Sequence, residues 1–236
     1  MKTISRSQTT VARPASAPAG SSVKTRYIVL AAGIGLLIFV LLMEFVLAPQ
    51  GGSPRSEAEL AALQRPHATA VGSPDARVNV VEFLDPACST CREFYPLVKG
   101  LIEDNPGKIR LAIRLVAFHP NSDIAVNALE AAKLQGKFWQ VLDNLLASQP
   151  RWVIQHRVDP DALWVQLQAM DLDLDKLRAD MASPEVANNV ARDAQDSKTL
   201  KVAATPEYFV NGQGLPEFGF DQLRRLVGAE IAKAYR

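Results

Sequence analysis

The sequence predicts an α/β domain, one sheet with a helical insertion, preceded by one N-terminal transmembrane helix. Three observations support this fold class. A long apolar run stands near the N-terminus, a strand, helix, strand pattern opens the part that follows, and a block of helical periodicity separates these strands from a later one. The chain has 236 residues, of which 48% are hydrophobic, and a formal net charge of +1, so it can bury a core and has no general basic surface for nucleic acid.

The first predicted element is a transmembrane helix over residues 27–48. This run is apolar with a single charge, Glu44, and a helix needs roughly 20 such residues to cross a bilayer. A cleaved signal peptide is the alternative, but the preceding segment is long and cleavage after Ala48 would leave Pro49 beside the scissile bond. An uncleaved anchor is therefore the favoured interpretation.

The flanking charges predict the orientation of this anchor. Residues 1–26 contain lysines and arginines and no acidic residue, whereas both signs occur after the run. Positive flanks stay inside, so we expect 1–26 to be a disordered basic tail in the cytoplasm and the rest to be exported. The predicted location is the bacterial inner membrane, with the C-terminal domain in the periplasm, where a disulfide can persist.

A linker is predicted between the membrane and the domain, over residues 49–76. It contains a Gly-Gly-Ser-Pro breaker at 51–54 and a Gly-Ser-Pro-Asp turn signal at 72–75, with at most a short helix at 56–64 between them. The remainder, 77–236, has the length of one domain.

The elements of this domain follow from the periodicity. Residues 78–84 predict a buried strand that ends at Asp-Pro, a helix beginning near Cys88 shows helical spacing over 92–104, and 109–116 alternates as a second strand. The inserted block, about 121–200, is helical at 123–134, 137–148, 159–170, 174–181 and 184–198. A strand returns at 207–211, and an amphipathic helix at 220–234 ends the chain.

The chemistry of the chain is predicted to lie in its two cysteines, Cys88 and Cys91. They stand at a strand-to-helix junction, and the free N–H groups and the dipole of a helix N-terminus stabilise an anion there. Such a position lowers the pKa of a cysteine, which makes Cys88 the expected thiolate. Cys91 follows one turn later on the same helix face, within the reach of a disulfide.

Two other interpretations of the cysteines were weighed. A metal site would need Cys88 and Cys91 together with His67, His119 or His156, but no two of these histidines are close in sequence, as the second ligand pair of a structural zinc site would be. No metal is therefore predicted. A pair of inert buried thiols is disfavoured by their position at the start of a helix on the exported side.

Two segments carry a family resemblance: Glu-Phe-Leu-Asp-Pro-Ala-Cys-Ser-Thr-Cys at 82–91 and, far downstream, Ala-Thr-Pro-Glu-Tyr-Phe-Val-Asn-Gly at 204–212. In this order they resemble the DsbA-like branch of the thioredoxin superfamily, with its helical insertion. The resemblance covers about 77–236. A CxxC motif alone is a weak signal, but this order of strand, CxxC, insertion, Thr-Pro and strand is specific. It implies a thioredoxin-like mixed sheet and a protein thiol-disulfide oxidoreductase that needs no cofactor beyond its redox-active Cys88–Cys91 disulfide.

The resemblance also assigns roles to three further residues. Glu82 matches the buried acid that moves a proton to or from Cys91, and a carboxylate in an apolar strand should have a raised pKa; the alternative is a Glu on an exposed strand face. Thr205 is implied to present its backbone to an extended substrate. Pro206 is implied to be cis and to lie beside the CxxC motif, the alternative being an ordinary strand start.

The dipeptide between the cysteines departs from the family pattern. Strongly oxidising members carry a His there, whereas Ser89 and Thr90 offer hydroxyls without positive charge. We therefore expect them to tune the disulfide to be less oxidising. His119 is interpreted as a surface or capping residue outside the catalytic set.

The predicted function is a membrane-anchored periplasmic thiol-disulfide oxidoreductase that exchanges disulfides with exported proteins. Its expected partners are exported protein thiols or disulfides, a membrane redox partner and the bilayer through residues 27–48, with no nucleic acid. The alternatives are a reductant or isomerase fed by a membrane electron donor, a copper carrier using the same two thiols, and a non-catalytic assembly subunit.

Overall fold

The computed structural model describes residues 55–236, together with Phe39 and Met43. The chain divides into two compact units, Met1–Gly51 and Gly52–Arg236. The predicted tail and the predicted membrane span, apart from those two residues, lie outside the described residues. In the part of the chain that the structure describes, no helix combines the length and the apolar character that a membrane crossing requires.

The second unit is built on one five-stranded sheet with the order β1-β3-β2-β6-β7. Its strands are β1 (Thr69–Gly72), β2 (Val78–Leu84), β3 (Ile109–Leu115), β6 (Glu207–Val210) and β7 (Gln213–Gly214). The central strand β2 runs parallel to β3 and antiparallel to β6, so the sheet is mixed, as predicted. The carboxyl end of β2 leads directly into the cysteine segment.

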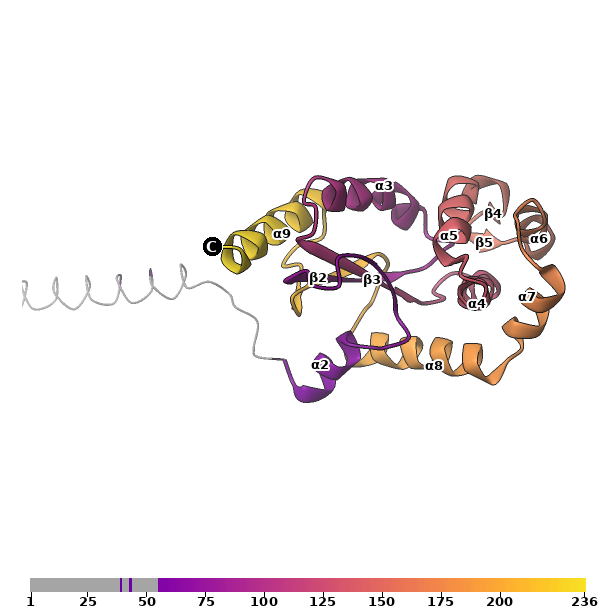
Figure 1. The fold of residues 1–236 in the computed structure, drawn as a ribbon, viewed down its shortest axis with the longest axis horizontal. Coiled ribbons are helices and arrows are strands. Elements are labelled where there is room, and N and C mark those ends of the chain that lie inside the picture. Colours follow the sequence, from indigo (N-terminus) through magenta and orange to yellow (C-terminus); the bar gives the residue numbers. More distant parts are fainter. Residues whose placement is uncertain (1–38, 40–42, 44–54) are drawn as a thin grey trace, which may run out of the picture. The chain divides into compact units, whose positions relative to one another are not determined.

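Helices cover both faces of this sheet. Figure 1 shows α3 (Ser89–Glu103) and α9 (Phe220–Ala234) on one face, and α2 (Glu57–Leu63) and α8 (Pro184–Thr199) on the other. Strand β2 is buried on both sides because its residues alternate between two apolar clusters. The cluster on the α3 face is the larger and extends into the helical insertion.

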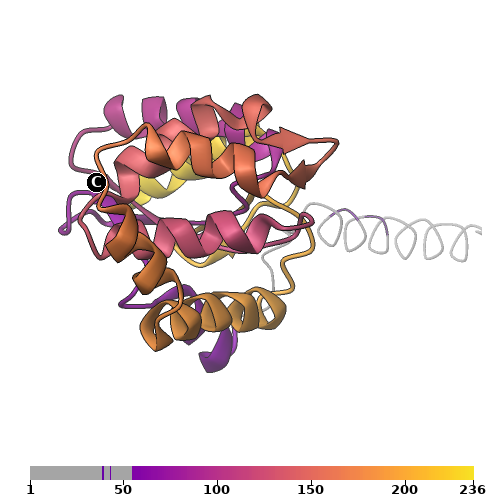
Figure 2. The same cartoon turned by 90° about the vertical axis from the view of Figure 1, so that its right-hand side faces the viewer.

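The predicted helical insertion is present. Figure 1 shows α4 to α7 beside the sheet, and in Figure 2 they face the viewer. Before α8 it contains α4 (Ser122–Lys133), α5 (Phe138–Ala147), a short 3₁₀ helix (Gln149–Arg151), α6 (Pro160–Gln168) and α7 (Leu174–Met181). A small hairpin of β4 (Val153–Ile154) and β5 (Arg157–Val158) was not predicted. Its turn residues, Gln155 and His156, adopt positive φ angles of 50° and 62°, and neither is a residue type that usually signals such a turn.

The prediction of a linker up to residue 76 was wrong for its described part. Helix α2 packs on α8, and β1 pairs with β3 as the edge strand of the sheet. An ion pair and a hydrogen bond fix the segment between α2 and β1, because Arg65 contacts Asp196 at 2.7 Å and Nε2 of His67 lies 2.6 Å from Oδ1 of Asp193. A four-residue strand is too short to show a period, so only these long-range contacts reveal that the domain begins before residue 77.

A buried cluster of charged side chains holds α8 against the sheet. Arg114 of β3 is fully buried and donates hydrogen bonds to Asp193 at 2.7 Å, to Asp196 at 2.6 Å and to the carbonyl oxygen of Ala62 at 2.6 Å. The backbone N–H of Leu115 donates to the other Asp193 oxygen at 3.0 Å. One buried cation thus connects β3, α2 and α8, and its carboxylate partners are themselves hydrogen-bonded.

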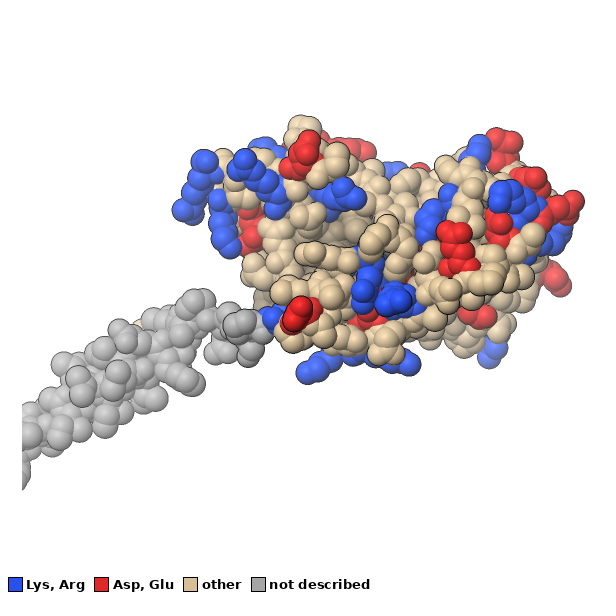
Figure 3. All heavy atoms as spheres, turned by 60° about the horizontal axis from the view of Figure 1, so that its bottom comes forward, with Lys and Arg blue, Asp and Glu red and all other residues tan. Residues whose placement is uncertain are grey.

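Acidic and basic side chains are interspersed on the face shown in Figure 3, which looks toward the layer of α2 and α8. This distribution agrees with the balanced composition of 26 Lys and Arg against 25 Asp and Glu.

Candidate active site

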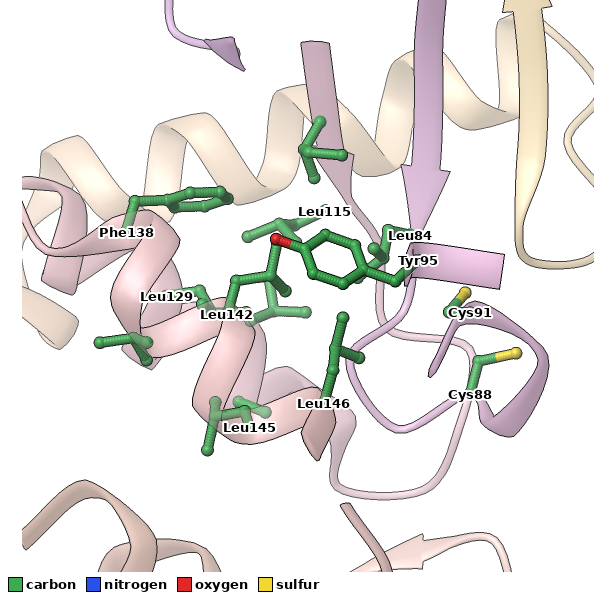
Figure 4. Close-up of a cluster of buried hydrophobic side chains, with 14 of the residues drawn as sticks. Leu84, Cys88, Cys91, Tyr95, Leu115, Leu129, Phe138, Leu142, Leu145 and Leu146 are labelled. Atoms are coloured by element: carbon green, nitrogen blue, oxygen red, sulfur yellow. The ribbon is translucent and has the colours of Figure 1, made fainter. Parts of the chain in front are cut away.

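The two cysteines lie where β2 passes into α3. Cys88 is the N-cap residue of α3 with an extended backbone, and Cys91 lies in the first turn of the helix. Both are free thiols, with exposed fractions of 6% for Cys88 and 0% for Cys91. Figure 4 shows the pair beside the large apolar cluster, near Leu84 and Tyr95. The structure therefore buries one thiol completely and leaves the other an opening to solvent.

The two thiols differ strongly in acidity. A hydrogen bond from the Cys91 thiol, more than any other contact, lowers the pKa of Cys88 to about 5, against the opposing effect of burial. The side chain of Thr205 and then the backbone N–H groups of Cys91 and Thr90 lower it further. Burial raises the pKa of Cys91 well above its ordinary value. The helix N-terminus thus stabilises a thiolate at Cys88, while Cys91 remains a thiol that donates to it.

Glu82 is fully buried in β2, on the α3 face of the sheet, so the alternative of an exposed strand position was wrong. The hydroxyl of Tyr208 donates to Oε1 of Glu82 at 3.1 Å, whereas Oε2 has no hydrogen-bond partner among the described residues. Burial raises the pKa of Glu82 to about 8, although the Tyr208 hydrogen bond opposes the rise. The charge of Glu82 in turn raises the pKa of Cys91, so the two groups are electrostatically coupled.

Thr205 and Pro206 lie on the other side of Cys88. The peptide bond between them is cis, and Pro206 is buried immediately before β6. The carbonyl oxygen of Thr205 lies 3.2 Å from Sγ of Cys88, which can donate to it in the protonated, thiol form. The structure therefore brings together Cys88, Cys91, Glu82, Thr205 and Pro206, all of which the sequence had singled out.

Ser89 and Thr90 are partly buried in the first turn of α3. The contribution of Thr90 to the acidity of Cys88 comes from its backbone N–H. A backbone donor is supplied by almost any residue type, so this contribution does not depend on the Thr90 side chain.

Three residues of the site were not predicted. Gln149, from the insertion, is buried and donates from Nε2 to the carbonyl oxygens of Pro86 at 2.8 Å and Cys88 at 3.0 Å. Tyr208 lies directly opposite Glu82 in the β2–β6 register, and the Thr-Pro motif that marks the start of β6 could have pointed to it. Asp85 was interpreted only as the residue that ends a strand.

His119 makes side-chain contacts that the sequence did not predict. It is partly buried, and its Nδ1 lies 2.8 Å from the buried carboxylate of Asp85. Its ring also stacks near that of His156, with centroids 6.4 Å apart. Among the described residues there is no group of three or more His, Cys, Asp or Glu side chains arranged to hold a metal ion.

The fold and the cysteine site define a DsbA-like class of protein, and comparisons with known proteins agree. The thioredoxin family model matches residues 64–229, so the chain belongs to the thioredoxin family. A thioredoxin-like oxidoreductase from Silicibacter pomeroyi DSS-3 has a similar structure, with a TM-score of 0.65 and 26% identity over 76% of this chain and 99% of that chain.

Two kinds of sequence relative are also similar. A probable disulfide bond formation protein D from Bacillus anthracis is 28% identical over 173 residues, 69% of this chain and 78% of the relative. A Na(+)/H(+) antiporter, NhaA 3, from Salinispora tropica is 35% identical over 145 residues, and the match covers 60% of this chain but 21% of the antiporter. The relatives matched over most of their length have names that describe an oxidoreductase or a probable disulfide bond formation protein.

Proposed function

We propose that this chain exchanges disulfides with exported proteins through Cys88 and Cys91. The observation that carries the proposal is the contrast between the two thiols, because a neighbouring thiol and a helix N-terminus lower the pKa of Cys88 to about 5 while burial raises that of Cys91. A pair with one stable thiolate and one protected thiol is suited to thiol-disulfide exchange. The disulfide itself is the redox group, and the proposal includes no further cofactor.

In the oxidising direction, a substrate thiolate attacks Sγ of Cys88 in the Cys88–Cys91 disulfide. A mixed disulfide forms, and Cys91 leaves and takes up a proton. A second thiolate of the substrate then attacks the substrate sulfur of the mixed disulfide, which forms the substrate disulfide and releases Cys88 as a thiolate. Two electrons pass from the substrate to the cysteine pair, and the reducing direction follows the same path backwards.

Glu82 is proposed to supply the proton that Cys91 takes up. A carboxyl group whose pKa is raised to about 8 by burial carries a proton at neutral pH and can give it to a strongly basic leaving thiolate. The unpartnered Oε2 is free to hold that proton, while Tyr208 fixes Oε1.

Thr205 is proposed to hold the substrate. Its carbonyl oxygen stands 3.2 Å from Cys88 Sγ, so a substrate segment that pairs with the Thr205 backbone would present its own sulfur to Cys88. Pro206 supports this placement from its buried position before β6.

The favoured direction is oxidation. A stabilised thiolate favours the reduced form of the pair, and a disulfide whose reduced form is stabilised is an oxidant. The absence of a positive charge at Ser89 and Thr90 places the expected potential below that of the strongest oxidants. The name of the Bacillus anthracis relative, a probable disulfide bond formation protein, is in line with this direction.

We further propose that residues 27–48 anchor the domain outside the cytoplasm and that a membrane partner restores its disulfide. The apolar run and the basic residues before it support this arrangement. The chain spans about a fifth of the length of the antiporters that it matches, so antiport is not part of the proposal.

The reduction potential of the Cys88–Cys91 couple tests the proposed direction. We expect a value between about −270 mV, typical of thioredoxin, and about −120 mV, typical of a strong oxidant. The full-length protein should also catalyse disulfide formation in a reduced, exported test protein, and Cys88→Ala should abolish this activity. A potential at or below about −270 mV would support the reductant alternative instead.

A further inference from the structure

The carboxylate of Asp85 is the most fully satisfied acceptor near the cysteines. Asp85 is fully buried, and both of its oxygens accept hydrogen bonds. Oδ1 accepts from the Ala87 backbone N–H at 2.8 Å and from the Ser122 hydroxyl. Oδ2 accepts from the backbone N–H groups of Phe118 at 2.7 Å and His119 at 2.9 Å, and it also lies 2.8 Å from Nδ1 of His119.

These contacts join two separate segments of the chain. One is the short connection from β2 to the cysteines, which contains Asp85 and Ala87. The other runs from the end of β3 to the start of α4, where the helical insertion begins. The carboxylate therefore fixes the cysteine segment to the entrance of the insertion.

The main chain of Asp85 contacts both cysteines. Its carbonyl oxygen accepts the backbone N–H of Cys88 at 3.0 Å. Burial is the main cause of the raised pKa of Cys91, and a hydrogen bond from the backbone N–H of Asp85 to its sulfur partly opposes that rise. Any shift of this main chain would move the turn that sets Cys88 at the N-terminus of α3.

We propose that Asp85 is a positioning residue, whose carboxylate holds the backbone turn that presents Cys88 and Cys91. This inference deepens the proposed function and rests on the same two cysteines. Asp85 acts through the main chain, and its carboxylate takes no part in the transfer of electrons.

The role requires a carboxylate, because both oxygens meet donors. If Asp85 were replaced by Asn, one orientation of the amide would point its NH₂ group at the N–H of Ala87, and the other would point it at the N–H groups of Phe118 and His119. Either orientation sets donor against donor. The isosteric Asp85→Asn change thus breaks the contacts without changing the volume.

The test compares Asp85→Asn with wild type in the full-length reduced protein, by following alkylation of Cys88 against pH. We expect the thiolate fraction of Cys88 to fall by roughly tenfold in the acid range, which corresponds to a rise of about one pKa unit. The reduction potential should become more negative, because the reduced form loses thiolate stabilisation. A merely structural role would lower stability and leave both readouts unchanged.

Asp193→Asn is the matched control. Asp193 is also buried and accepts hydrogen bonds from Arg114 and from a backbone N–H, but it lies on the opposite face of the sheet. This variant should lose at least as much stability as Asp85→Asn and keep the alkylation profile of Cys88. An equal shift in both variants would overturn the proposal, because the shift would then reflect general loosening.

Ser122→Ala keeps the proposal testable if Asp85→Asn does not fold. It removes one donor to Asp85 and retains the carboxylate, so we expect a smaller shift of the same sign. If Asp85→Asn folds and its pH profile of Cys88 alkylation is unchanged, the proposal is contradicted. If Asp85→Asn does not fold, an unchanged alkylation profile in Ser122→Ala contradicts it instead. Alkylation needs no turnover, so the result stands even if the proposed disulfide exchange fails its own test.

Discussion

The two faces of the sheet bury carboxylates in opposite ways. On the α8 face, Asp193 and Asp196 are held by Arg114, and Arg65 adds a second partner to Asp196. Burial alone would raise the pKa of Asp196, but the hydrogen bonds from Arg65 and Arg114 outweigh burial and keep it below its ordinary value. On the α3 face, the part of the chain that the structure describes gives Glu82 a single neutral donor and leaves one oxygen without a partner, and burial raises the pKa of Glu82 to about 8.

This contrast separates structure from chemistry. A buried carboxylate that is fully paired stabilises one arrangement of the helices and has no proton to exchange near neutral pH. A buried carboxylate left half-partnered costs stability, and its pKa falls in the range useful for proton transfer. Glu82 is the half-partnered carboxylate beside the cysteines, where Asp85 is fully hydrogen-bonded, whereas Asp193 and Asp196 lie on the opposite face of the sheet.

The largest expected effect comes from removing the cation of the paired face. Arg114→Met should destabilise the domain by about 3–5 kcal/mol, because it removes the buried cation that Asp193 and Asp196 share. Chemical denaturation measures this loss. Exchange activity per folded molecule should stay at the wild-type level, and a loss of activity in the folded fraction would break the separation between the two faces.

Glu82→Gln should have the converse effect. We expect disulfide exchange to slow by roughly 10²-fold or more, as for the loss of a general acid, with stability unchanged or raised. Stopped-flow kinetics of the mixed-disulfide step measures the exchange rate, and thermal unfolding measures the stability. Wild-type kinetics between pH 6 and 8 would return Glu82 to a structural role.

The pH dependence of stability gives a second signature of Glu82. The pKa of Glu82 is raised from 4.5 to about 8 in the folded state, so the unfolded state loses its proton first as pH rises. The contribution of protonated Glu82 to the free energy of unfolding is therefore complete below about pH 4.5 and is lost progressively up to about pH 8. In Glu82→Gln this decline should disappear, and an equal decline in both proteins would contradict the assigned pKa.

A smaller effect is expected from Tyr208→Phe. It removes the one hydrogen bond to Glu82, which opposes the rise in the pKa of that carboxyl group, so the pKa of Glu82 should rise further. We expect a loss of about 1 kcal/mol in stability and an alkaline shift of the pH–rate profile. An acid shift would mean that Tyr208 does not act through Glu82.

Much of this site could be predicted from local patterns. The CxxC pair, Glu82 and the Thr-Pro motif stand in a recognisable order, and long periodic elements such as β2 and α9 were predicted with their observed bounds. Gln149 could not be predicted, because its contact with Cys88 joins residues 61 positions apart and depends on how the insertion folds back.

The early part of the domain was missed for a related reason. Strand β1 has four residues, and its identity as a strand depends on pairing with β3. The preceding Arg65 and His67 look like linker residues until Asp196 and Asp193 of α8 are placed beside them. Short segments stabilised by distant partners carry little periodic signal of their own.

The central claim is that Cys88 is the thiolate of the pair and Cys91 its protected partner. Alkylation of the reduced full-length protein across pH, with each modified cysteine identified by mass spectrometry, tests it directly. The structure predicts a midpoint of about 5 for Cys88 and no modification of Cys91 below its ordinary pKa of 9.0. Equal rates for both thiols, or a midpoint for Cys88 near the value of about 8.5 for a free cysteine, would contradict the account.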